Sequence, residues 1–228
     1  MRRSLLILTL AGLTGVGLSA HEIISTKLTW TEHVSRIFHR RCAGCHREGG
    51  SAPMPLATYD QVRPWAKAVK LQVLSRKMPP WDAVKGYGAF QGDISLSQDE
   101  IAVISSWVEG GAPRGDLHFL DVSLLESMQP EVEPPSYQDL PVAHDTVLDS
   151  AVAAVGVRLG EMEEGSGFEL RARLPSGEVR DLIWIQDFRR LAPREYYFLE
   201  PVQLPRGSRL FVYPGKSGAA LLVATTPP

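Results

Sequence analysis

The chain has 228 residues, 44% of them hydrophobic and 22% charged, with a formal net charge of -2. This is the composition of an ordinary soluble protein with room for one or two domains. The slightly acidic balance gives no support to nucleic-acid binding, so that class of function is set aside.

The first twenty residues have the layout of an export signal. Two arginines follow Met1, and an apolar run from Ser4 to Leu13 leads into small residues that end at Ala20. The run is shorter than the roughly 20 residues needed to span a bilayer. We expect cleavage after Ala20 and a periplasmic or otherwise exported bacterial protein. Leu18, two places before Ala20, is a poor residue for a signal cleavage site, so an uncleaved membrane anchor stays open as the alternative.

Three capping boxes predict helices that begin after Thr29, Thr58 and Ser97. The acidic or amide partners three residues later are Glu32, Gln61 and Glu100. Pro64 is predicted to end one short turn and to open the next helix at its first position. Residues 65–74 of that helix are expected to be amphipathic. A pair of glycines at 110–111 is expected to end the last helix.

Cys42, Cys45 and His46 form the motif C-x-x-C-H, and these are the only cysteines of the chain. The motif is the attachment signature of c-type haem. Two thiols one helical turn apart can each add to one vinyl group of the porphyrin. A histidine directly after the second thiol can then reach the iron as proximal ligand. The sequence thus predicts one covalent haem c on these three residues.

Other uses of the two cysteines fit less well. A thioredoxin-like pair follows a buried strand, whereas residues 34–41 have helical spacing. A zinc site needs four ligands and would have to recruit His39 or a distant histidine besides His46. A disulfide across so short a loop would remove little entropy from the unfolded chain.

Met78 is predicted to be the distal ligand of the iron. The paired prolines at 79–80 end the preceding helix and stiffen the loop. A thioether held there can ligate iron and favours the reduced state.

Met54, between two prolines, is the rival distal ligand, and its closeness to His46 counts against it. His33 and His39 would offer bis-histidine ligation instead. They lie on the helix that approaches the motif, and we expect them at the surface.

The helix entering C-x-x-C-H, the Met-Pro-Pro loop and the Leu-Ser-x-x-Glu-Ile start of the last helix resemble bacterial class I cytochrome c domains. The resemblance covers roughly residues 29–115. It implies a small all-α fold around haem, with crossing terminal helices. It also implies that Cys42 and Cys45 form the thioethers and that His46 and Met78 are the proximal and distal ligands.

Beyond residues 128–141, which are rich in proline and acidic side chains, the pattern changes to strands. Strands are predicted at 152–159, 168–174, 179–185, 196–202, 209–213 and 219–224. We therefore predict an α + β chain of two domains, a small all-α cytochrome c fold followed by a small antiparallel β-sandwich. The expected boundaries are signal peptide 1–20, cytochrome domain 21–120, linker 121–143 and sandwich 144–228.

The strand-rich part weakly resembles the C-terminal domain of copper type II ascorbate-dependent monooxygenases. The likeness rests on the turn at 174–177, the apolar strand at 182–185 and the segment 200–207. That family holds copper with a His-x-His pair and a methionine, but Arg158 and Gly160 stand where the pair aligns. The sequence after the linker contains one histidine, His144, and one methionine, Met162, as candidate copper ligands. We expect neither copper nor hydroxylation.

These patterns predict an electron carrier rather than an enzyme, with redox proteins as partners, no nucleic acid, and a membrane tether only if the signal is uncleaved. Two alternatives stay open. The chain can be an electron-feeding subunit or remnant of a haem and copper monooxygenase-like enzyme. It can also be a haem-based gas or redox sensor whose distal ligand leaves.

Overall fold

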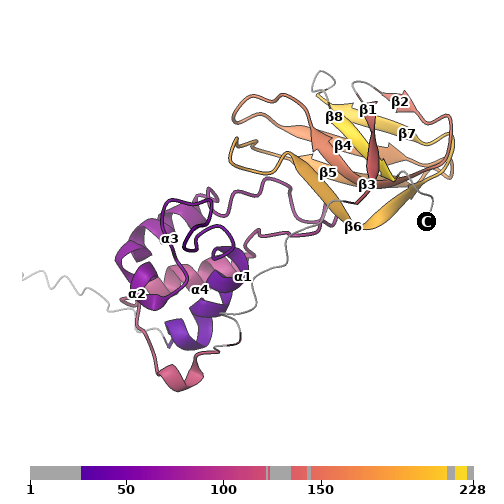
Figure 1. Cartoon of the computed structure of the whole chain (residues 1–228). Coiled ribbons are helices and arrows are strands. Elements are labelled where there is room, and N and C mark those ends of the chain that lie inside the picture. The colour runs from indigo at the N-terminus through magenta and orange to yellow at the C-terminus, as the bar shows by residue number, and fades with distance from the viewer. Residues whose placement is uncertain (1–26, 122, 124–134, 143–144, 215–218, 225–228) are drawn as a thin grey trace, which may run out of the picture.

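The computed structural model describes residues 27–121, 123, 135–142, 145–214 and 219–224. The expected export signal lies outside these residues. Within them, the structure contains no helix with the length and apolar character needed to cross a membrane. The described chain mixes helices, in its first half, with two antiparallel sheets, in its second (Figure 1).

The helical part begins where the first capping box predicts. A π-helical turn, Trp30–Val34, leads into α1 (Ser35–Arg41). It is followed by α2 (Tyr59–Val62), a 3-10 turn at Arg63–Trp65, α3 (Ala66–Leu74), α4 (Gln98–Glu109) and a 3-10 turn at Leu117–Phe119.

The boxes at Thr58 and Ser97 are complete, with both reciprocal hydrogen bonds. At Thr29 only half of the box forms. Its hydroxyl accepts from the Glu32 N–H, while its own N–H donates to His33 Nδ1 at 3.3 Å.

Aromatic side chains fill the core of the helical part. The Trp30 ring lies 5.2 Å from Phe38 and 6.1 Å from Trp107 between centroids, and all three are buried. The Trp107 indole N–H donates to the Pro113 carbonyl at 2.9 Å, which satisfies its polar atom inside the core. The first helical segment and α4 therefore pack on each other through large apolar groups.

The described strands form two four-stranded antiparallel sheets with the orders β1-β8-β3-β6 and β2-β7-β4-β5. Their bounds are β1 Tyr137–Val142, β2 Thr146–Val147, β3 Val152–Leu159, β4 Phe168–Arg173, β5 Val179–Ile185, β6 Glu195–Leu204, β7 Arg209–Tyr213 and β8 Ala219–Ala224. Residues of both sheets share one buried apolar core.

The six predicted strands correspond to β3–β8, whereas β1 falls inside the expected linker 121–143. The linker was predicted from the proline-rich, acidic composition of residues 128–141, which ends at Pro141. Because β1 is an edge strand that pairs only with β8, a residue without an N–H is tolerated there.

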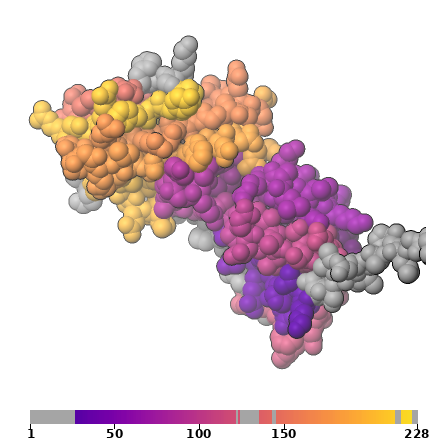
Figure 2. All heavy atoms as spheres, turned by 180° about the vertical axis from the view of Figure 1, so that it is seen from behind, coloured from indigo at the N-terminus to yellow at the C-terminus, as the bar shows by residue number. Residues whose placement is uncertain are grey.

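Residues 81–91, expected to belong to the helical domain, pack on the sandwich. The Val84 N–H donates to the Trp184 carbonyl on β5, and the Gln91 N–H donates to the Tyr197 carbonyl on β6, both at 2.8 Å. Ala83 is part of the core between the sheets, and Phe90 packs against that core. Seen from behind, the same stretch of chain lies against the sandwich (Figure 2). Segment 81–91 thus joins the two parts of the chain through extensive contacts.

Candidate functional site

The C-x-x-C-H motif forms a tight turn directly after α1. The N–H groups of Cys42 and Ala43 both donate to the Phe38 carbonyl at 2.8 Å, and those of Cys45 and His46 donate to the Cys42 carbonyl at 3.2 and 2.9 Å. Neither cysteine is in a disulfide; Cys45 is exposed and Cys42 partly buried. Two free thiols and an imidazole therefore lie on one turn of chain.

The His46 ring is oriented by a backbone carbonyl. His46 Nδ1 lies 2.8 Å from the Met54 carbonyl oxygen. Because a carbonyl only accepts, Nδ1 is the donor of this bond, and in the neutral ring Nε2 is the nitrogen with the free lone pair. Histidines that bind metals are held in this way, with one nitrogen on a carbonyl and the other free for the ion.

The loop after the motif holds His46 at further points. The Leu56 N–H donates to the His46 carbonyl at 2.8 Å, and the Ala52 N–H donates to the Cys45 carbonyl at 3.2 Å. Gly50 has no room for a side chain, because a Cβ there would lie 2.2 Å from the Cys45 carbonyl oxygen. Sequence reasoning missed this role of Gly50, because the atoms that crowd it are backbone and side-chain atoms of residues 45 and 47 in the folded turn.

Burial raises the pKa of the Cys42 thiol to about 12, and the nearby Glu100 carboxylate adds to the effect. Redox-active cysteine pairs of the thioredoxin kind need the opposite, a lowered thiol pKa. The environment of Cys42 therefore favours a neutral thiol at physiological pH.

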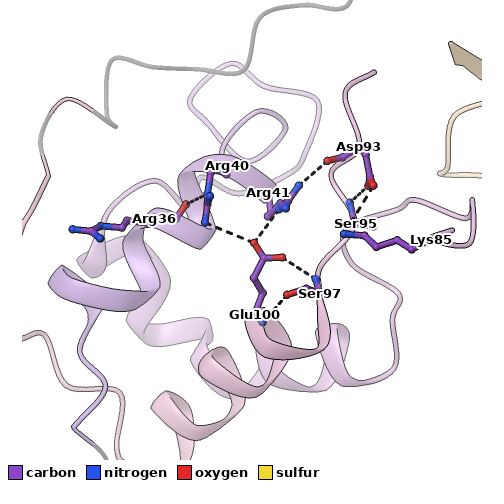
Figure 3. A network of polar contacts seen from close by, with 8 residues as sticks. All are labelled: Arg36, Arg40, Arg41, Lys85, Asp93, Ser95, Ser97 and Glu100. Atoms are coloured by element: carbon purple, nitrogen blue, oxygen red, sulfur yellow. Dashed lines mark hydrogen bonds and ion pairs between the residues drawn. The ribbon is translucent and has the colours of Figure 1, made fainter. Parts of the chain in front are cut away.

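A polar network fixes the end of α1 beneath this turn (Figure 3). Arg41, the neighbour of Cys42, donates to Glu100 at 3.2 Å and to the Asp93 carbonyl at 2.7 Å. Glu100 also accepts from the Ser97 N–H at 2.8 Å. One carboxylate thus caps α4 and pairs with the arginine that precedes the cysteines. The capping box signalled Glu100 as a cap, but nothing local signalled its partner.

Met78 lies on a different segment, the loop that follows α3, and the structure records no bond between it and the His46 turn. The N–H groups of Lys77 and Met78 both donate to the Gln72 carbonyl, at 2.9 and 3.3 Å. Met78 is partly buried and is not a member of either apolar core formed by the described residues. Met54, in contrast, packs against the helical core.

His39 is buried, with 7% of its surface exposed, so its expected place at the surface is wrong. It lines a hollow of about 190 Å³ together with Trp30, Tyr59, Leu117 and Leu120. The last two come from beyond α4, and such long-range cover leaves no local sequence pattern. Burial lowers the pKa of His39, which favours its neutral form. His33 stays partly exposed and uses Nδ1 in the helix cap.

The positions compared with copper ligands in the strand-rich part have other partners. Arg158 forms ion pairs with Glu195 at 2.8 Å and with Asp139, and Met162 packs against the sandwich core. His144 lies outside the described residues. Among those described, no three or more His, Cys, Asp or Glu side chains gather as a metal-holding group.

We compared the chain with family models, curated proteins and solved structures, and none of them matches it.

Proposed function

We propose that this protein is an exported carrier of single electrons with one covalently attached haem c. Cys42 and Cys45 would form the thioethers, His46 would be the proximal ligand and Met78 the distal one. The observation that carries the proposal is the His46 ring, whose Nδ1 is engaged by the Met54 carbonyl at 2.8 Å beside two free thiols. That leaves Nε2 as the nitrogen for iron.

The helical part is proposed to be a small all-α cytochrome c fold. Its support is the contact of Trp30 and Phe38 with α4 through Trp107, together with the position of the cysteine turn at the end of α1. A contact between the first and last helical segments is what the crossing terminal helices of the resembled family would require.

When bound, the haem would supply an iron that changes between ferric and ferrous states. The chain's residues hold it and set its properties. The Met54 carbonyl keeps the His46 ring in one tautomer and orientation, and the Arg41–Glu100 pair holds the helix end that carries Cys42. Met78 offers a neutral, soft sulfur, which favours the reduced state.

Met78 is preferred over Met54 because of what each side chain does in the structure. Met54 packs against the helical core and lends its carbonyl to His46. Moving its thioether to a ligand position would remove the side chain from this packing. Met78 is partly buried and belongs to neither apolar core of the described residues.

The test is to express the full chain in a bacterial host with c-type haem maturation, and to measure its mass and its ferric spectrum. We expect the mass of one attached haem and the weak red absorption band of thioether-ligated ferric haem. Met78→Leu should abolish the band, whereas the matched variant Met54→Leu should keep it. Loss of the band only in Met54→Leu would reverse the assignment. Absence of attached haem in the matured wild-type chain would overturn the proposed function.

A further inference from the structure

One arginine of the strand-rich part binds the chain on both sides of Met78. Arg189, in the loop after β5, donates from its guanidinium to the Arg76 carbonyl and, at 3.1 Å, to the Trp81 carbonyl. The four residues 77–80 lie between these two carbonyls. A single side chain therefore spans the base of the loop that carries the methionine.

The same arginine makes a buried ion pair. Arg189 Nε lies 2.6 Å from Asp82 Oδ1, and the Arg189 backbone N–H donates to Asp82 Oδ2 at 2.7 Å. The Asp82 side chain is fully buried, and that of Arg189 is 17% exposed. Charge-assisted hydrogen bonds in such an environment are among the stronger ones in proteins. The fork of donors on arginine suits this multiple bonding, which a lysine cannot reproduce.

The chain after Met78 is held by the sandwich along its length. Beyond Asp82, Val84 pairs with β5 and Gln91 with β6, while Trp81 packs edge-on against the Tyr196 ring at 5.2 Å between centroids. On the helical side, the carbonyls of Gln72 and Val73 in α3 accept from the N–H groups of residues 76–78. The position of Met78 thus depends on the strand-rich part as much as on the helices.

We infer that Arg189 is a positioning residue for Met78, and that the sandwich serves as the rigid support of the distal ligand. This inference rests on the proposed haem function. By fixing residues 76 and 82 relative to each other, Arg189 restricts the positions of the thioether. A restricted thioether competes better with added ligands for the iron.

The experiment compares wild type, Arg189→Ala and Arg190→Ala, each as matured full-length protein. Arg190 is the matched control, because it occupies the same loop but is exposed and pairs only loosely with Glu164 at 3.7 Å. Hydrogen exchange of the peptide over residues 75–84 reports directly whether the contacts of Arg189 with residues 76, 81 and 82, here called the Arg189 clamp, hold the loop. This measurement does not depend on the haem. Two measurements report how firmly the Met78 thioether is bound to the iron: the intensity of the red band, and the affinity of the ferric protein for added imidazole.

Arg189→Ala should speed exchange over residues 75–84 by about tenfold or more, because it removes several charge-assisted bonds. It should also weaken the red band and raise the affinity for imidazole by about tenfold, whereas Arg190→Ala should match wild type. If Arg189→Ala is not recovered folded, Arg189→Lys, which keeps the charge but loses the fork, takes its place.

The outcomes separate the two proposals. A wild-type protein without the red band refutes Met78 ligation, and with it this inference, whatever Arg189 does. A wild-type band that stays unchanged in Arg189→Ala, with unchanged imidazole affinity, overturns the positioning role and leaves the carrier function intact. If hydrogen exchange over residues 75–84 is the same in Arg189→Ala and wild type, the Arg189 clamp does not hold this loop and the inference is overturned.

Discussion

Gly50 lies so close to the backbone carbonyl of Cys45 that it is the most informative position for a single substitution in the cysteine turn. In Gly50→Ala the new Cβ would lie 2.2 Å from the Cys45 carbonyl oxygen and 3.1 Å from that of Arg47. A relaxed carbon to carbonyl oxygen contact needs about 3.3 Å. The Cys45 carbonyl must therefore move by about 1 Å, in the turn that carries both thiols.

The cost follows from what that movement disturbs. Overpacking of this kind costs about 1–3 kcal/mol, and loss of the Ala52 N–H bond to the Cys45 carbonyl adds about 0.5–1.5 kcal/mol. We expect Gly50→Ala to lower the free energy of unfolding by about 2–4 kcal/mol. The melting temperature should fall by about 5–15 °C, with a reduced yield of attached haem.

Two neighbouring glycines supply the controls. At Gly44 a Cβ meets nothing within 4 Å, so Gly44→Ala should behave like wild type. Gly49 is also open but has φ +71, so Gly49→Ala should show backbone strain alone, about 1–2 kcal/mol. Thermal unfolding and haem yield are measured on all three variants. Equal stability and loading of Gly50→Ala and Gly44→Ala would refute the close approach at Cys45.

Three further predictions concern other elements. Ser97→Ala removes the hydroxyl that accepts from the Glu100 N–H at 3.1 Å and should cost about 1 kcal/mol in thermal unfolding, with Ser97→Asp restoring the cap; equal melting of the alanine variant and wild type would contradict this. His39 has a native pKa below its ordinary 6.5, so the unfolded state takes up its proton first and stability falls as the pH drops below about 6.5. His39→Gln should lose this part of the acid sensitivity in melts between about pH 7.5 and 5.5, and an unchanged pH slope would count against the burial of the ring. Gly156→Ala puts a Cβ 2.5 Å from the Tyr196 carbonyl oxygen between two paired strands; chemical denaturation should show a loss of about 1–3 kcal/mol, and no loss would disprove that contact.

Local patterns predicted the elements well where a local rule decides the structure. The starts after Thr58 and Ser97 follow from side chains that bond to backbone three residues away. The strands β3–β8 follow from apolar periodicity between turn residues. In the candidate site, Cys42, Cys45 and His46 share one turn because the motif itself is contiguous.

What sequence reasoning missed depends on partners far along the chain. Arg189 and Asp82 are 107 positions apart, and no spacing rule connects them. The Met54 carbonyl that orients His46 is a backbone atom, so the identity of the residue does not encode it. The burial of His39 was missed because the groups that cover it come from other segments.

Segment 81–91 has a consequence for any attempt to study the sandwich alone. Its residues pair with β5 and β6, and these strands end their respective sheets on the same side of the sandwich. A fragment of residues 135–228, which keeps β1 on β8, would present the outer edges of β5 and β6 to solvent. Such edges are templates for pairing with other chains, so the isolated fragment should self-associate. The intact chain avoids this because its own first half supplies the missing cover.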